Sequence, residues 1–177
     1  KEFSKYADST RFQKFDVSTS TYRNVIGSFG TEHEERLIVG AHYDVCGNQD
    51  GADDNASGVV GLLEIARLLD GKKLNTRIDL VAYSLEEPPY FRSENMGSYK
   101  HAAWLHANNI PVRGMICLEM IGSFDERKGS QDYPIGLLKL FYGSKGDFIT
   151  VVSKMGRGKF ARQYKRKMKR TKHIKTK

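Results

Sequence analysis

Three short hydrophobic runs are the clearest pattern along the chain. The first lies in RLIVGAHYD, residues 36–44, the second extends from Arg77 to Leu85, and the third extends from Arg113 to Met120. Near-continuous apolar runs of this length are typical of strands that are buried on both faces of a mostly parallel sheet. The pattern therefore predicts three central strands.

Between these runs the apolar residues are spaced as on one face of a helix. Residues 57–69 carry apolar side chains three and four positions apart, with Asn55 able to cap the start and Gly71 to end the helix. Residues 96–107 predict a second helix, on which His101 and His106 are expected at the surface. Alternating strands and helices predict an α/β fold, with a mostly parallel mixed sheet flanked by helices on both faces.

The flanking segments are less regular. Residues 1–15 predict a weakly structured or helical lead-in, whereas residues 15–30 alternate between apolar and polar positions, as in an edge strand or hairpin arm. Residues 122–146 predict a long loop near the site.

Length and composition are those of one soluble globular domain over residues 1–177. The hydrophobic fraction is 39%, the charged fraction is 28%, and no apolar stretch approaches the ~18 residues of a membrane span. Cys46 and Cys117 are the two cysteines, which we expect to be free thiols.

Charge is concentrated at the C-terminal end. Residues 154–177 hold 12 of the 29 Lys and Arg residues and no acid, whereas the rest of the chain has a net charge of −4. Phe160, Tyr164 and Met168 recur every four residues, so this tail predicts a basic amphipathic helix whose apolar stripe packs on the sheet. The basic face could contact nucleic acid or anionic lipid. Because no nucleic-acid motif accompanies it, a solvated helix face is the favoured interpretation.

Polar residues follow the first strand and precede the first helix. His42 could supply an imidazole nitrogen, and Asp44 could accept the other ring N–H and fix the tautomer. Asp53 and Asp54 lie beside Gly51, where a carboxylate could bridge two cations. Each feature alone also fits a structural role, because a strand-end histidine often forms a structural hydrogen bond and acids often cap helices.

The second and third strands carry carboxylates. Glu86 and Glu87 end a buried strand, where adjacent charges repel each other unless a cation or a shared proton compensates. One could bind a metal while the other accepts a proton from water, as in metal-assisted hydrolysis. Glu119 lies in an otherwise apolar strand, where an unpaired charge would be costly. Solvated loop acids are the alternative for the Glu-Glu pair.

The motifs AHYD, GADDNASG, SLEEPP and LEMIG occur in this order between Arg23 and Phe124. Together they resemble the zinc-dependent aminopeptidases with a two-metal centre, which include bacterial leucyl aminopeptidases and yeast aminopeptidase Y. The resemblance implies that Asp53 bridges two zinc ions, that His42 and Glu119 complete one zinc site, and that Glu87 belongs to the other. It also implies that Glu86 is the general base, that Asp44 orients His42 and that Asp54 supports the site. A cis peptide bond after Asp53 is implied as well.

The sequence departs from this family pattern at two points. Glu119 stands where the family usually has Asp, and no Ser-Asp-His segment follows it to supply the histidine of the second metal. His173 is the only later histidine, and its basic neighbours oppose cation binding. The chain therefore resembles the N-terminal part of such a domain.

These motifs favour a metallopeptidase that removes N-terminal residues from peptides with a free N-terminus. The alternatives are a single-zinc glutaminyl-peptide cyclotransferase and an inactive truncated domain that binds metal or polyanions. The resemblance suggests a secreted or periplasmic protein, with a cytoplasmic location as the alternative, and the sequence does not indicate an oligomeric state.

Overall fold

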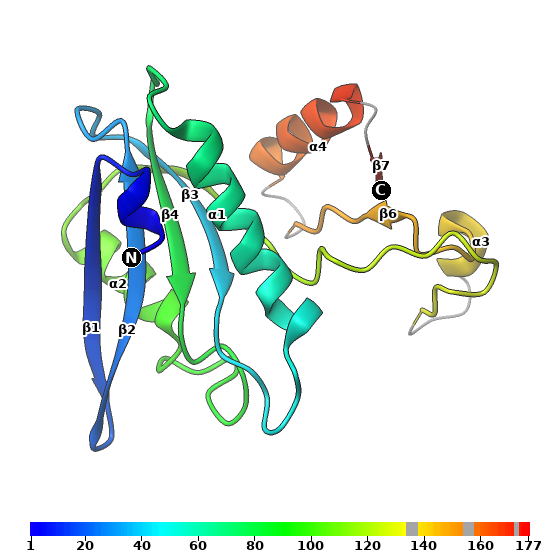
Figure 1. Cartoon of the computed structure of the whole chain (residues 1–177), viewed down its shortest axis with the longest axis horizontal. Coiled ribbons are helices and arrows are strands. Elements are labelled where there is room, and N and C mark those ends of the chain that lie inside the picture. The colour runs from blue at the N-terminus through cyan, green and yellow to red at the C-terminus, as the bar shows by residue number, and fades with distance from the viewer. Residues whose placement is uncertain (134–137, 154–157, 172–173) are drawn as a thin grey trace. The chain divides into compact units, whose positions relative to one another are not determined.

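The computed structural model describes residues 1–133, 138–153, 158–171 and 174–177. These residues form two compact units, Lys1–Gly122 and Ser123–Lys177 (Figure 1). The first unit contains the main sheet and every residue expected at the metal site. That both units belong to one domain stays a prediction.

The first unit contains five strands, two α-helices and two shorter helical turns. In chain order its elements are the 3-10 turn η1 (Phe3–Lys5), β1 (Ser9–Val17), β2 (Ser20–Phe29), β3 (Arg36–His42), the irregular helical turn η2 (Ala52–Ser57), α1 (Gly58–Leu69), β4 (Arg77–Tyr83), α2 (Gly97–Ala107) and β5 (Val112–Cys117).

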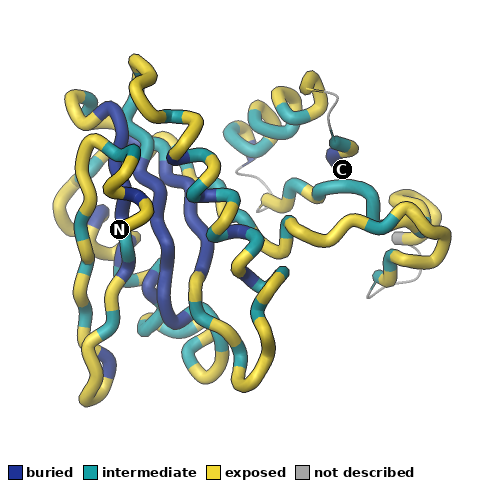
Figure 2. Tube along the Cα trace, viewed as in Figure 1, coloured by how far each residue is buried: buried dark blue, intermediate teal, exposed yellow. Residues whose placement is uncertain are grey.

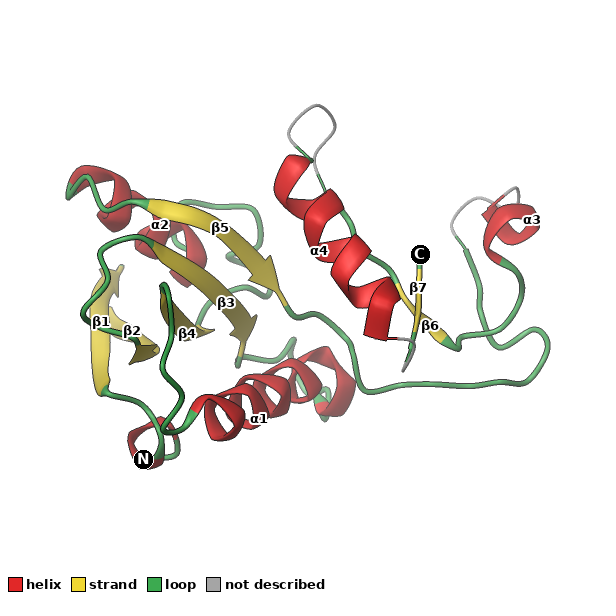
Figure 3. Ribbon diagram, turned by 90° about the horizontal axis from the view of Figure 1, so that it is seen from above, coloured by secondary structure: helices red, strands yellow, loops and turns green. Residues whose placement is uncertain are grey.

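The strands form a mixed sheet in the order β1-β2-β4-β3-β5. Strand β3 is parallel to both of its neighbours, β4 and β5, whereas β2 is antiparallel to β1 and β4. Helices α1 and α2 lie on opposite faces of this sheet (Figure 3). The predicted α/β fold with a mixed sheet between helices is confirmed.

Alternating strand residues build a core on each face of the sheet. On one face Leu62 and Ala66 of α1 cover Leu80, and on the other Leu105 of α2 lies over Val81. All five are buried, and the central strands form long buried stretches of the tube in Figure 2. Fully burying one large apolar side chain contributes roughly 1.5–3 kcal/mol, so the two layers hold the central strand ends in place.

Three expectations about local structure are wrong. The segment assigned to a lead-in contains β1, which pairs with β2 from Ser9 onward. His101 is buried, with 1% of its surface exposed, because its side chain points from α2 toward the sheet and contacts Tyr83 of β4. The loop expected over residues 122–146 includes helix α3 (Leu138–Tyr142).

The second unit contains α3, β6 (Phe148–Ile149), α4 (Lys159–Thr171) and β7 (Lys175–Thr176), and β6 pairs in parallel with β7. Helix α4 lies within the segment predicted as a basic amphipathic helix: Phe160, Tyr164 and Met168 are half-buried and no residue of α4 is fully buried. The start of the basic tail at Lys154 lies outside the described residues. Packing of its apolar stripe on the sheet stays a prediction.

None of the helices in the described ranges is both long and apolar enough to cross a membrane.

Candidate metal centre

The predicted site residues come together at the carboxyl ends of the three parallel strands. His42 is the last residue of β3, Glu86 and Glu87 follow β4, and Glu119 follows β5. Because β3 pairs with both β4 and β5, their chain ends are neighbours. Crevices at the carboxyl ends of parallel strands are the usual ligand sites of α/β sheets.

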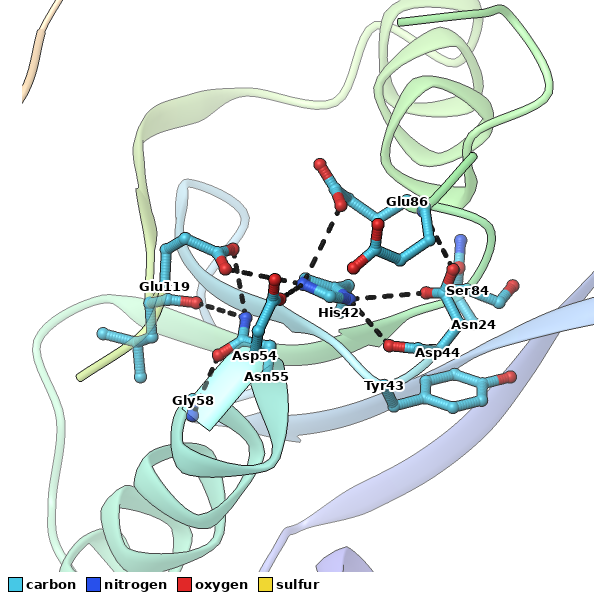
Figure 4. A network of polar contacts seen from close by, with 12 residues as sticks. Asn24, His42, Tyr43, Asp44, Asp54, Asn55, Gly58, Ser84, Glu86 and Glu119 are labelled. Atoms are coloured by element: carbon cyan, nitrogen blue, oxygen red, sulfur yellow. Dashed lines mark hydrogen bonds and ion pairs between the residues drawn. The ribbon is translucent and has the colours of Figure 1, made fainter. Parts of the chain in front are cut away.

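Carboxylates surround the imidazole of His42, which is 3% exposed. Its Nε2 lies 3.0 Å from Asp54 Oδ1, 3.5 Å from Glu119 Oε1 and 3.8 Å from Glu86 Oε2 (Figure 4). Two overlapping sets of side chains place their ligand atoms within 4.8 Å of one another: His42, Asp54 and Glu119, and His42, Glu86 and Glu87. A single imidazole is thus shared between two potential cation sites.

Asp54, not Asp53, contributes to this cluster. The carboxylate Oδ1 of Asp53 accepts a hydrogen bond from the backbone N–H of Gly122 at 2.8 Å instead. The chain kinks inside η2, where Asp54 has φ −104° and ψ 89°, so adjacent side chains point in different directions. The cis peptide bond lies between Asp54 and Asn55, one residue later than expected. The place beside His42 that was expected for Asp53 is therefore occupied by Asp54.

Asp44 lies on the other side of the imidazole. Its backbone carbonyl lies 3.0 Å from Nδ1 of His42, and its carboxylate Oδ1 lies 3.6 Å from the same nitrogen. A carbonyl oxygen can only accept, so Nδ1 carries a proton and donates to it, and Nε2 faces the carboxylate cluster. Asp44 Oδ2 also accepts the backbone N–H of Glu87 at 3.0 Å and so ties the Glu-Glu segment to β3.

The crowding of charges shifts the pKa values of the cluster. Burial lowers the pKa of His42, but Asp44, Glu119 and Glu86 outweigh it and raise that pKa to about 9. Burial raises the pKa values of Glu86 and Glu119, and neighbouring carboxylates add to the increase. All three pKa values are raised, because the negative charges stabilise protonated His42, whereas burial and like charges disfavour the ionised glutamates.

Four carboxylates lie within 4 Å of His42, from Asp44, Asp54, Glu86 and Glu119. Across the described part of the chain, these four acids form ion pairs with no cation other than this histidine. Even a protonated imidazole leaves an excess of negative charge. One imidazole and several carboxylate oxygens are a donor set that suits zinc, so the residues fit a bound divalent cation.

His101 and the two cysteines do not belong to either set of possible ligand side chains. Cys46 and Cys117 are free thiols, as expected. The Nδ1 of buried His101 forms a hydrogen bond with the Tyr83 hydroxyl, with 2.9 Å between the two atoms. His173 lies outside the described residues. Asn55, which the sequence indicated only as a helix cap, also contacts Glu119, and its position directly after Asp54 was the one available signal.

Known proteins resemble the chain over most of its length. The family model of Peptidase family M28 matches residues 24–172. The uncharacterized protein YfbL of Escherichia coli is 45% identical over 151 residues, which cover 81% of this chain and 46% of that protein. A probable zinc metalloprotease of Pyrenophora tritici-repentis is 30% identical over 140 residues, which cover 73% of this chain and 30% of that protein. The chain thus spans less than half the length of both relatives.

Solved structures share the fold. A glutaminyl cyclase of Porphyromonas gingivalis has a TM-score of 0.61 and 28% identity, covering 72% of this chain and 49% of that one. A Zn-dependent exopeptidase of Parabacteroides distasonis has a TM-score of 0.57 and 25% identity, covering 72% of this chain and 52% of that one.

Proposed function

The chain belongs to peptidase family M28, and we propose that it supplies the catalytic centre of a zinc-dependent peptidase that removes residues from the N-terminus of peptides. The observation that carries the proposal is the excess of carboxylates around His42 at the carboxyl edge of the sheet. Such a cluster is stable when a cation compensates its charge. The similarity to a Zn-dependent exopeptidase supports cleavage at a chain end.

His42, Asp54 and Glu119 would hold the first zinc ion. Three protein ligands leave a position open, which is the usual arrangement in catalytic zinc sites. Zinc, when bound, supplies a Lewis acid that polarises the peptide carbonyl and makes water more acidic. In a two-ion centre, Asp54 would face both ions and Glu87 would belong to the second.

Glu86 is the proposed general base. Its carboxylate points toward the cluster from the segment after β4, and its pKa is raised, mainly by burial. A carboxylate whose pKa lies closer to neutrality is a better proton acceptor near pH 7. Glu86 takes a proton from the water whose oxygen attacks the carbonyl carbon. It then delivers that proton to the amide nitrogen as the carbon–nitrogen bond breaks.

The decisive experiment compares the zinc-loaded chain with its Glu86→Gln variant. We expect hydrolysis of short peptides with a free N-terminus, no hydrolysis of their N-acetylated forms, and a loss of about 10²–10⁴-fold in kcat in the variant. Zinc content, measured by mass spectrometry, should stay the same because Glu86 is not one of the three ligands. Glu34→Gln, an exposed acid before β3, is the matched control and should keep full activity.

Three results would contradict the proposal. Ring closure of an N-terminal glutamine with release of ammonia, and no peptide hydrolysis, would indicate a cyclotransferase. Zinc binding without any turnover would indicate a metal-binding domain. Full activity in Glu86→Gln would show that another group is the base.

A further inference from the structure

Asn55 is a buried amide at the edge of the cluster, with 1% of its surface exposed. Its Nδ2 donates hydrogen bonds to Glu119 Oε2 at 3.1 Å and to the Leu118 carbonyl at 2.9 Å. Its Oδ1 accepts the backbone N–H of Gly58 at 3.1 Å. Figure 4 shows the amide between the start of α1 and Glu119. Both amide hydrogens and the carbonyl oxygen are thus engaged.

Glu119 needs such a partner more than the other acids do. It follows the end of β5, and 46% of its side chain is exposed. A glutamate arm at such a place has several accessible rotamers, and ordering a glutamate side chain costs up to about 2 kcal/mol of entropy. The bond from Asn55 holds Oε2, while Oε1 lies 3.5 Å from His42 Nε2.

The two segments have a second link that does not involve the carboxylate. Ser57 Oγ donates to the Asp53 carbonyl at 2.7 Å and accepts the backbone N–H of Ile121 at 3.1 Å. Ser57 therefore joins the start of α1 to the chain after β5, as Asn55 does through the Leu118 carbonyl. The contact with the Glu119 carboxylate is what distinguishes Asn55 from Ser57.

We propose that Asn55 is a positioning residue that holds the Glu119 carboxylate in the orientation required for cation binding beside His42 and Asp54. The proposal rests on the metal-binding function argued above. An asparagine suits this place because one side chain must donate to Glu119 and accept from Gly58. Hydrogen bonds that orient a metal ligand commonly change metal affinity 10–100-fold.

The test measures the zinc affinity of the full chain by competition with a chromophoric chelator. Asn55→Ser is the main variant, because serine can still cap α1 but is too short to reach Glu119. We expect its zinc affinity to fall about 10–100-fold. Ser57→Ala is the matched control, and it should lower the melting temperature while changing zinc affinity less than about threefold.

A double-mutant cycle separates positioning from general loosening of the fold. In a Glu119→Ala background, Asn55→Ser should have almost no further effect on zinc affinity, because its effect acts through that carboxylate. Equal zinc affinity of the unaltered chain and Asn55→Ser would overturn the positioning role alone. If Asn55→Ser lowered zinc affinity equally in the unaltered chain and in the Glu119→Ala background, the positioning role would be overturned as well. Failure of the unaltered chain to bind zinc would overturn both the role of Asn55 and the proposed function.

Discussion

His42 Nε2 and Asp54 Oδ1 lie 3.0 Å apart, although one residue ends a strand and the other lies in the kinked turn before α1. This contact decides which of two adjacent aspartates faces the imidazole. Asp53 instead accepts the backbone N–H of Gly122. The two carboxylates are therefore expected to differ in chemistry despite their adjacency.

Asp54→Asn and Asp53→Asn should separate these roles. Asp54→Asn removes a charged ligand, so zinc affinity should fall by more than about 100-fold. Asp53→Asn keeps an oxygen that can accept from Gly122, so its zinc affinity should change by less than about tenfold. Chelator competition measures both. A larger loss in the Asp53 variant would show that the sequence-based choice of Asp53 as ligand was right.

Asp44→Asn should weaken zinc binding without abolishing it. Asparagine can still accept the Glu87 N–H, but it removes the negative charge 3.6 Å from His42 Nδ1 and so makes the imidazole a poorer donor. We expect zinc affinity about tenfold lower, with little change in the melting temperature. Asp44→Ala should lower zinc affinity further, because it also removes the hydrogen bond from the Glu87 N–H that holds the segment of Glu86 and Glu87. Equal affinities in Asp44→Asn and the unaltered chain would exclude an electrostatic role.

Asp79 should govern the acid stability of the sheet. It is fully buried on β4 and pairs with Arg36 Nη1 at 3.0 Å and Arg77 Nε at 2.8 Å. Burial raises the pKa of Asp79, but the hydrogen bonds and charges, chiefly of Arg77, outweigh it and hold that pKa below 3.8. Its stabilisation is therefore complete above pH 3.8 and is lost as pH falls through the lower folded value.

Asp79→Asn leaves two guanidinium groups without their anion, so the free energy of unfolding at pH 7 should fall by about 3–5 kcal/mol. Urea denaturation of the zinc-free chain measures this change. Asp70→Asn, at an exposed acid after α1, is the control and should stay within about 0.5 kcal/mol. Similar stabilities of the two variants would show that the buried pairs contribute little.

The spacing of hydrophobic residues along the chain predicted the elements in which buried positions recur at regular intervals. The runs around Leu37 and Leu80, and the helical spacing of residues 57–69, need only their own sequence to be recognised. Strand β1 has only one buried residue, Val17, and is held by its pairing with β2, which local sequence does not show. Tertiary contact also decided the burial of His101, since its partner Tyr83 lies on another element.

Most of the carboxylate cluster around His42 was also predictable, because its residues lie at the ends of predicted strands. His42, Glu86 and Glu119 follow runs whose order in the sheet could be anticipated, so their convergence follows from topology. The choice between Asp53 and Asp54 could not be made in the same way. It depends on the backbone angles of a kinked turn, and adjacent aspartates have the same chemistry until that turn is built.

His101 should make the zinc-free chain less stable below neutral pH. Burial, with the charge of Arg11, lowers the pKa of His101 from 6.5 to about 4. The unfolded chain thus takes up a proton at higher pH than the folded chain, and the stabilisation present above pH 6.5 is lost as pH falls toward 4. The loss should reach about 3 kcal/mol.

Urea denaturation at several pH values between 7.5 and 4 measures this loss, and His101→Gln should flatten the slope. Glutamine can still form a hydrogen bond with the Tyr83 hydroxyl, as donor or as acceptor, but has no proton to gain in this range. His106→Gln is the matched control, because His106 is an exposed histidine on the same helix, and this variant should keep the slope of the unaltered chain. An unchanged slope in His101→Gln would show that other groups, and not this buried imidazole, cause the acid sensitivity.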